Sequence, residues 1–179
     1  MQPIFLIGYM GCGKSTLGRN VGAITGMQFI DLDNYIEARF HATISQLFAR
    51  HGEDGFRDIE RRMLHEVAEF ENVIVACGGG TPCFFDNMDY MNSRGVTVHL
   101  TTSVPRLHSR LKRGRAKRPL IAGKSDDELL RFIQTALAQR MPYYSKARHT
   151  FEGDLLENSS EIGATASKFI NRIIIPLAQ

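Results

Sequence analysis

The residues whose types and spacing could do chemistry begin with the segment GYMGCGKST at residues 8–16. It matches the pattern G-x-x-x-x-G-K-[ST], which Gly8 opens and which Gly13, Lys14 and Ser15 close. Glycines let the backbone wrap closely and aim its N–H groups at phosphate oxygens. Lys14 would then reach the β- and γ-phosphates of a nucleotide, and the Ser15 hydroxyl would bind Mg²⁺. The segment follows an apolar run and opens a helical pattern, so it predicts a bound nucleotide without identifying the phosphate acceptor.

Two aspartates follow the next apolar run, in the segment FIDLDNYIE. Asp31 and Asp33 are two residues apart, a spacing that puts both on one side of an extended chain. Two interpretations of Asp33 are equally open: a base for a substrate hydroxyl, or the N-cap of the amphipathic stretch that follows. Asp31 has no obvious capping role, so we expect it to support the Mg²⁺ site, indirectly or through water.

Two arginines occupy positions that suit an anionic substrate group. Arg57, in EDGFRDIE, lies near the first turn of a predicted helix, where its charge opposes the helix dipole. A bound anion would explain this position, and a solvated surface arginine is the alternative. Arg140, in QRMPYY, lies at the end of a predicted helix before Pro142. Helix ends favour cations in any case, so spacing alone leaves the role of Arg140 open.

Three consecutive glycines, Gly78, Gly79 and Gly80, directly follow the apolar run of VIVACGGGTP. They leave bare backbone N–H groups that can approach a ligand closely. A flexible turn is the alternative, but the position at the carboxyl end of a buried strand favours a ligand site.

A basic block extends from Val104 to Lys124 and contains eight Lys and Arg residues and no acidic residue. A solvated basic face and a nucleic-acid patch are two interpretations, although no aromatic residues are interleaved for base stacking. In a kinase, the block suits a mobile lid that carries Arg118 or Arg115 onto the transferring phosphoryl group. We place this lid at about residues 112–125.

The elements that would position these residues follow from hydrophobic periodicity. Short apolar runs rich in β-branched and aromatic residues predict strands at Ile4–Ile7, Gln28–Ile30, Val73–Ala76, Val96–Leu100 and His149–Phe151. Amphipathic patterns predict helices at Lys14–Thr25, Phe56–Phe70, Ser103–Arg113, Asp126–Met141 and Ser160–Ile174. This alternation predicts an α/β fold with a parallel sheet, in which ligands bind beyond the carboxyl ends of the strands.

Size and composition narrow the class of protein. The chain has 179 residues, which predicts one domain over residues 1–179, and its 43% hydrophobic and 23% charged residues are typical of a soluble globular protein. No apolar run approaches the ~20 residues that span a bilayer. The net charge of +3 is too small to indicate nucleic-acid binding by itself. The three cysteines, Cys12, Cys77 and Cys83, include no CxxC pair, so we expect reduced thiols and a cytoplasmic protein.

Six short motifs resemble those of shikimate kinases in order and spacing, and the resemblance covers the chain from Ile4 to about Phe151. The motifs are GYMGCGKST, DLD, FRDIE, GGGTP, KRPL and QRMPYY. The resemblance implies a three-layer P-loop kinase of the nucleoside-monophosphate-kinase type, with a five-stranded parallel sheet flanked by helices and a mobile lid. It implies transfer of the γ-phosphate of ATP to the 3-hydroxyl of shikimate, with Mg²⁺ and in aromatic amino acid biosynthesis. It also implies a substrate-binding region at about residues 33–60.

The resemblance also implies roles for particular residues. Asp33 would bind the substrate hydroxyls and act as the base, and Asp31 and Ser15 would serve the metal. Residues implied to bind shikimate are Asp33, Arg57, Gly78, Gly79, Gly80 and Arg140. Residues implied to bind ATP are Gly11, Cys12, Gly13, Lys14, Ser15, Thr16 and, from the lid, Arg118. Lys14, Asp33 and Arg118 would be catalytic.

The chain departs from the family pattern in two places. Cys77 and Pro82 flank the three glycines, where simpler residues are expected. The segment EGDLLENSS offers no arginine to stack on adenine, so Arg110 or backbone would have to serve.

Rival interpretations belong to other classes. A gluconate-type kinase of the same fold is the alternative enzyme, because gluconate also has a carboxylate. A regulatory nucleotide switch would need a base-reading NKxD motif, which the sequence lacks.

We expect the small molecules shikimate and ATP as partners, with no nucleic acid and no membrane. We also expect the protein to be a monomer.

Overall fold

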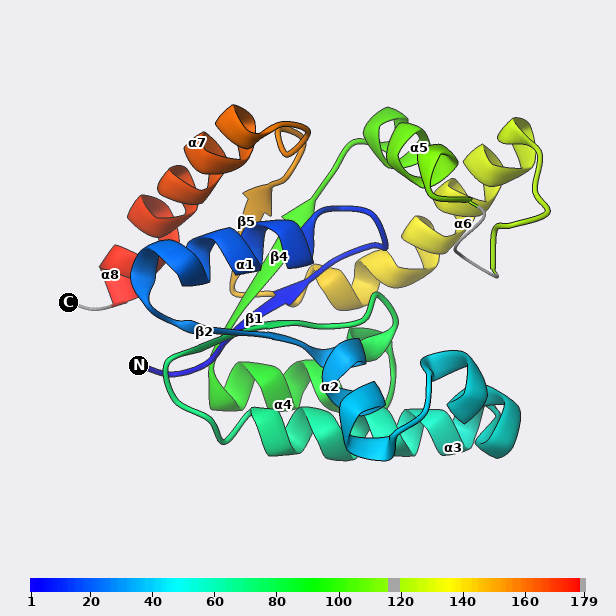
Figure 1. Cartoon of the computed structure of the whole chain (residues 1–179), viewed down its shortest axis with the longest axis horizontal. Coiled ribbons are helices and arrows are strands. Elements are labelled where there is room, and N and C mark those ends of the chain that lie inside the picture. The colour runs from blue at the N-terminus through cyan, green and yellow to red at the C-terminus, as the bar shows by residue number, and fades with distance from the viewer. Residues whose placement is uncertain (116–119, 178–179) are drawn as a thin grey trace.

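The computed structural model describes residues 1–115 and 120–177, and this part of the chain contains one five-stranded sheet (Figure 1). The strand order is β2-β3-β1-β4-β5, and every neighbouring pair is parallel. The strands are β1 (Ile4–Ile7), β2 (Gln28–Asp31), β3 (Val73–Ala76), β4 (Val96–Thr101) and β5 (His149–Glu152). The predicted α/β fold with a five-stranded parallel sheet is therefore confirmed, and each predicted strand is correct to within one residue.

Helices cover both faces of this sheet, which makes three layers. Figure 1 shows α1 and α7 on one side and α3 and α4 on the other, with α5 beside α6 at one end. The helices are α1 (Lys14–Thr25), α2 (Leu32–Phe40), α3 (Ile44–Val67), α4 (Asn87–Arg94), α5 (Val104–Arg113), α6 (Asp126–Tyr144), α7 (Ser159–Phe169) and α8 (Ile175–Leu177). A 3₁₀ turn, η1 (Thr81–Cys83), follows the three glycines, and a π-helical turn, η3 (Ile170–Ile174), joins α7 to α8. No helix in the described ranges is both long enough and apolar enough to cross a membrane.

Helix boundaries match the predictions best where a local signal marks them. α1 has the predicted bounds, and Gly26 caps it in the left-handed conformation with φ 75°. The prediction that a helix ends at Met141 is wrong, because α6 continues through Pro142 to Tyr144. Proline removes one helical hydrogen bond, but its restricted φ is itself helical, so the last turn can form. The C-terminal helical prediction over residues 160–174 is divided between α7 and the π-helical turn.

The predicted helix at Phe56–Phe70 is the second part of the longer helix α3 and ends at Val67. Gly52, with φ 67° and ψ −176°, interrupts the helical conformation and separates the two parts. Arg57 therefore lies near the start of the second part, as expected. The sequence reading missed the first part of α3 and the whole of α4, whose eight residues carry only three buried side chains.

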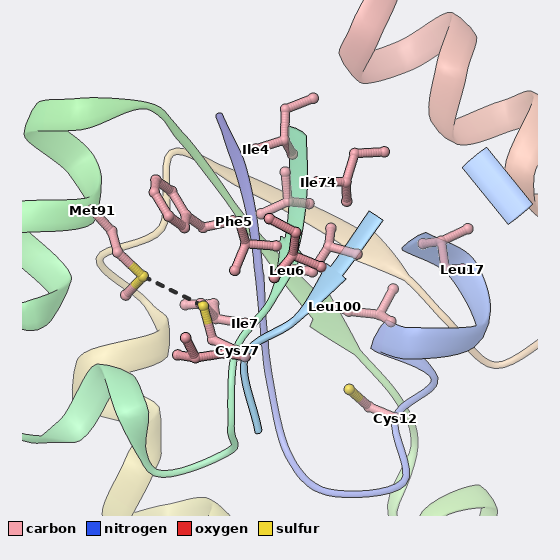
Figure 2. Close-up of a cluster of buried hydrophobic side chains, with 14 of the residues drawn as sticks. Ile4, Phe5, Leu6, Ile7, Cys12, Leu17, Ile74, Cys77, Met91 and Leu100 are labelled. Carbon is pink, nitrogen blue, oxygen red and sulfur yellow. Dashed lines mark hydrogen bonds between the residues drawn. The ribbon is translucent and has the colours of Figure 1, made fainter. Parts of the chain in front are cut away.

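The core is built around the central strand β1, whose four residues are all buried (Figure 2). On one side of the sheet, Cys77 at the end of β3 contacts Met91 of α4, with 3.7 Å between the sulfur atoms. All three cysteines are unpaired thiols, and Cys12 and Cys77 are buried. Cys77 therefore fills core space beside the three glycines, which explains a residue larger than expected at this position.

The start of β4 generates a prediction about stability. Gly95 precedes β4, and a side-chain carbon at this position would lie 2.2 Å from the Pro3 carbonyl oxygen. That oxygen accepts the Val96 amide at 2.9 Å and aligns β1 with β4, so neither strand can shift freely. We expect Gly95→Ala to lower the free energy of unfolding by about 2–3 kcal/mol in urea denaturation.

Gly163→Ala is the matched control, because Gly163 lies within α7 and a side-chain carbon there would have no heavy atom within 4 Å. We expect this control to raise the free energy of unfolding by about 0.5–1 kcal/mol. Equal stabilities of the two variants would contradict the predicted clash.

Candidate active site

The loop between β1 and α1 carries the glycines of the predicted phosphate-binding cradle. Gly8 and Gly13 have φ values of 143° and 103°, which side-chain-bearing residues rarely adopt. A side-chain carbon at Gly13 would lie 2.5 Å from Leu156, and one at Gly8 would lie 2.6 Å from the Leu100 carbonyl oxygen. Conformation therefore requires glycine at both positions, as the sequence pattern predicts, and at Gly8 the nearby backbone also leaves no space for a side chain.

Lys14 extends from the first turn of α1 into this loop and is buried. Its Nζ donates hydrogen bonds to the carbonyl oxygens of Gly8 at 2.8 Å and Tyr9 at 3.1 Å. A buried ammonium group needs such partners, because its desolvation is otherwise very costly. The loop backbone therefore places one positive charge at the centre of the cradle.

A cavity of about 350 Å³ opens beside the loop. It is lined by Gly11, Gly13, Lys14, Ser15, Thr16, Arg110, Leu156 and Glu157. Five of these are predicted ATP contacts. A sixth predicted contact, Cys12, is not in the lining, because its side chain is buried with its sulfur 3.6 Å from Lys14 Nζ. Leu156 and Glu157 lie on the segment after β5 and carried no recognisable signal in the sequence.

The two aspartates have roles that differ from those expected. Asp31 is the N-cap of α2 and accepts the Asn34 amide at 3.4 Å, whereas Asp33 lies in the first turn. The prediction that Asp31 lacks a capping role is therefore wrong, and so is the N-cap alternative for Asp33. Both errors have the same cause, which is a helix start placed too late in the chain. Strand β2 ends at Asp31, and helix α2 begins immediately afterwards.

The side chain of Asp31 also contacts the start of α1, directly after the nucleotide loop. Its Oδ2 accepts a hydrogen bond from Ser15 Oγ at 2.6 Å, which brings the two predicted metal residues together. Mg²⁺ takes hard oxygen ligands and usually needs only one or two from the protein beside phosphates and waters. The described residues contain no cluster of three or more potential ligands from His, Cys, Asp and Glu. The Ser15–Asp31 pair nevertheless fits Mg²⁺ held mainly by nucleotide phosphates.

Asp33 is a half-buried carboxylate between the loop and the three glycines. Its pKa is raised to about 6, mainly by burial and also by the neighbouring charges of Asp31 and Glu60, against the opposing effect of Lys14. A side-chain carbon at Gly78 would lie 3.1 Å from Asp33 Oδ1. The carboxylate therefore lies against the backbone of the glycine segment.

Arg57 is held in an enclosed polar and aromatic environment. Its side chain is only 13% exposed, and its Nη1 donates to Glu60 Oε2 at 2.8 Å. Its guanidinium lies 4.0 Å from the centre of the Phe84 ring, a close cation–π contact. The alternative of a solvated surface arginine is therefore wrong, since a side chain that is only 13% exposed has little contact with water.

Glu60 anchors this arrangement and was missed in the sequence. It is fully buried, and its second oxygen accepts the Thr81 hydroxyl at 2.6 Å. A buried carboxylate with two such donors holds Arg57 and the turn after the glycines together. Its i,i+3 spacing from Arg57 was the one signal that could have found it.

The glycine backbone lies directly against both predicted arginines. A side-chain carbon at Gly80 would lie 3.0 Å from Arg57 Nη2, and one at Gly79 would lie 3.0 Å from Arg140 Nη1. Arg140 also lies 5.3 Å from the centre of the Tyr9 ring in the donor loop. The structure therefore brings Asp33, the glycines and both arginines to one place, although together they span more than a hundred residues of the chain.

Arg110 of α5 links the donor loop to the segment after β5. Its Nη1 donates to the carbonyl oxygens of Gly11 and Cys12, and its Nη2 donates to those of Gly153 and Asp154, at 2.9–3.3 Å. Its Nε donates to Glu157 at 2.7 Å. The planar guanidinium thus satisfies five acceptors at once, a geometry that lysine cannot reproduce. Arg110 also lines the cavity, as its expected place beside the nucleotide requires.

The predicted lid falls partly outside the described residues. Arg118 lies in residues 116–119, so its position is not described. Arg115, the alternative lid arginine, donates to the Lys124 carbonyl oxygen at 2.6 Å and forms an ion pair with Asp126 at the start of α6. Arg115 thereby ties the two ends of this connection together.

We expect Arg110→Lys to weaken ATP binding about tenfold, measured by isothermal titration calorimetry, because the five-bond fork that shapes the loop is lost. Arg106→Lys on the exposed side of the same helix is the matched control and should bind ATP normally. If both variants bound ATP as the unmodified chain does, Arg110 would have no part in shaping the nucleotide site.

Comparison with known proteins agrees with this geometry. The family model for shikimate kinase matches residues 10–173. A shikimate kinase from Phocaeicola vulgatus is 54% identical over 97% of this chain and 99% of its own length. The solved shikimate kinase from Bacteroides thetaiotaomicron has a TM-score of 0.92 at 49% identity and covers 95% of this chain and 97% of that chain. A shikimate kinase from Acinetobacter baumannii, solved in complex with shikimate, has a TM-score of 0.84 at 32% identity and covers 100% of this chain and 96% of that chain. This chain belongs to the shikimate kinase family.

Proposed function

We propose that this chain transfers the γ-phosphoryl group of ATP to the 3-hydroxyl of shikimate and releases shikimate 3-phosphate and ADP. The observation that carries the proposal is the convergence of Asp33, Arg57, Gly79 and Arg140 beside the donor loop. Membership of the family, and the shikimate complex of the Acinetobacter relative, support the same acceptor.

In this proposal, the acceptor is held by charge and by backbone. Arg57 and Arg140 bind the shikimate carboxylate, because guanidinium groups match the planar geometry of carboxylates. The amides of residues 78–80 add contacts that a side chain would block. Asp33 binds the hydroxyls of the ring from the donor side.

Asp33 is also the base of the proposed reaction. With a pKa raised to about 6, it is mostly ionised at pH 7 and still a better proton acceptor than an ordinary aspartate. It takes the proton of the 3-hydroxyl as that oxygen attacks the γ-phosphorus. The bond to the β–γ bridging oxygen breaks, and ADP leaves with the electron pair.

The donor side stabilises the charge that develops during transfer. Lys14 reaches the β- and γ-phosphates, and Arg118 from the lid joins it on the transferring group. Ser15 and Asp31 would hold Mg²⁺, which supplies charge neutralisation at the phosphate oxygens when bound. Gly11, Cys12, Gly13 and Thr16 contribute to the nucleotide site through the loop and the first turn of α1.

The remaining assignments extend the same proposal. The whole chain acts as one domain, with residues at about 33–60 serving the acceptor and those at about 112–125 closing as a lid. The enzyme works as a cytoplasmic monomer in aromatic amino acid biosynthesis, on small molecules alone.

A coupled assay of ADP release tests the acceptor. We expect turnover with shikimate and none with gluconate or nucleoside monophosphates. Turnover with gluconate alone would transfer support to the gluconate-type kinase. A gel-shift experiment at low salt should show no retardation of nucleic acid, since electrostatic binding would be strongest there.

We expect Asp33→Asn to lower kcat by about a thousandfold or more while ATP binding is retained, because the amide cannot accept the hydroxyl proton. Asp54→Asn, an exposed position on α3, is the matched control. Steady-state kinetics and calorimetry with ATP measure the two effects. A near-normal kcat for Asp33→Asn would remove Asp33 from the reaction.

We expect Arg118→Ala to lower kcat about a hundredfold with a smaller change in KM for ATP, because a lid arginine acts mainly on charge that develops during transfer. Arg131→Ala, an exposed position on α6, is the control and should leave both constants unchanged. An effect confined to KM for ATP would show a binding role only.

A further inference from the structure

The three consecutive glycines raise a question about orientation. Glycine allows its peptide planes to rotate more freely than any other residue, so the segment at residues 78–80 cannot orient its own amides. Two bonds shape its ends: Thr81 N–H donates to the Gly78 carbonyl at 3.1 Å, and Cys83 N–H donates to the Gly80 carbonyl at 2.8 Å. Among the described residues, the N–H groups of Gly79 and Gly80 have no hydrogen-bond partner. Another contact must therefore decide which way the central peptide faces.

Tyr144, the last residue of α6, makes that contact. Its hydroxyl donates to the Gly79 carbonyl oxygen at 2.6 Å, a short hydrogen bond between residues that are 65 positions apart. The side chain is fully buried, and its ring centre lies 4.9 Å from that of His99 on β4. Burial also raises the pKa of Tyr144, so the hydroxyl keeps its proton and remains a donor.

The geometry of the peptide bond carries the effect to the neighbouring amide. In a trans peptide the carbonyl and the following N–H point in opposite directions. The Gly79 carbonyl points to the buried Tyr144, so the Gly80 N–H points away from it. Gly80 itself is half-buried and lies against the Arg57 guanidinium. The hydrogen bond therefore turns the Gly80 amide away from the buried Tyr144 ring, in a residue that lies beside Arg57.

We propose that Tyr144 is a positioning residue that holds the Gly79–Gly80 peptide with its N–H toward the acceptor pocket, an inference that rests on the proposed function. Without the hydroxyl, rotation at two adjacent glycines would let the carbonyl face the pocket instead. A carbonyl oxygen there would repel the carboxylate and hydroxyl oxygens of shikimate. Tyr144 thus acts on the acceptor through the backbone and touches no reacting atom.

Tyr144→Phe tests the proposal, because it removes only the hydroxyl and keeps the ring beside His99. We expect KM for shikimate to rise about five- to tenfold, the equivalent of one buried hydrogen bond. KM for ATP should change less than about twofold. Tyr143→Phe is the matched control, since Tyr143 is the adjacent residue of α6 and is 37% exposed. A loss of thermal stability with an unchanged ratio of the two KM values would overturn the proposal and leave a purely structural role.

A measurement on the unmodified chain keeps the proposal testable if the variant folds poorly. In protein labelled with ¹⁵N-glycine, shikimate should shift the Gly80 amide resonance and slow its hydrogen exchange. An unperturbed Gly80 amide at saturating shikimate would overturn the proposal. If the unmodified chain instead failed to phosphorylate shikimate, the proposed function would fail, which is a separate result.

Discussion

The parallel pairing of β1 with β3 is the constraint on which the rest of the site depends. Leu6 lies opposite Ala76, and the Cys77 amide donates to the Leu6 carbonyl at 3.0 Å, so the two strands end side by side. Each strand is followed by a loop rich in glycine, and bare backbones can approach where side chains would collide. The nucleotide loop after β1 and the three glycines after β3 therefore meet at one edge of the sheet, where parallel sheets bind ligands.

Charge then gives this edge its chemistry. A guanidinium and a carboxylate removed from water are costly unless each finds its partner, and Glu60 supplies one for Arg57 while it also holds Thr81. Among the described residues Asp33 forms no ion pair, and its pKa rises because burial and nearby carboxylates disfavour its charge. One carboxylate is thus used for structure, and the other has a raised pKa beside the donor loop.

Particular residues show how far sequence reasoning reaches. Gly8, Gly13 and Lys14 were predictable because a short motif states both their types and their conformations. Asp31 was misjudged because helix α2 begins directly after β2. The N-cap position therefore falls on Asp31, two residues before Asp33. Arg57 stayed ambiguous until its burial was known, since nothing in the residue types predicts the enclosure by Phe84 and Glu60.

The sequence by itself determined the nucleotide loop, the parallel α/β fold and the strands to within one residue, because local motifs and hydrophobic periodicity specify these features. Only the tertiary structure decided how Arg110 braces the loop and how Tyr144 orients the Gly79 carbonyl. Both contacts join segments more than sixty residues apart, and each depends on the placement of whole helices against the sheet. Local signals carry no information about such placement, because it follows from how every layer packs at once.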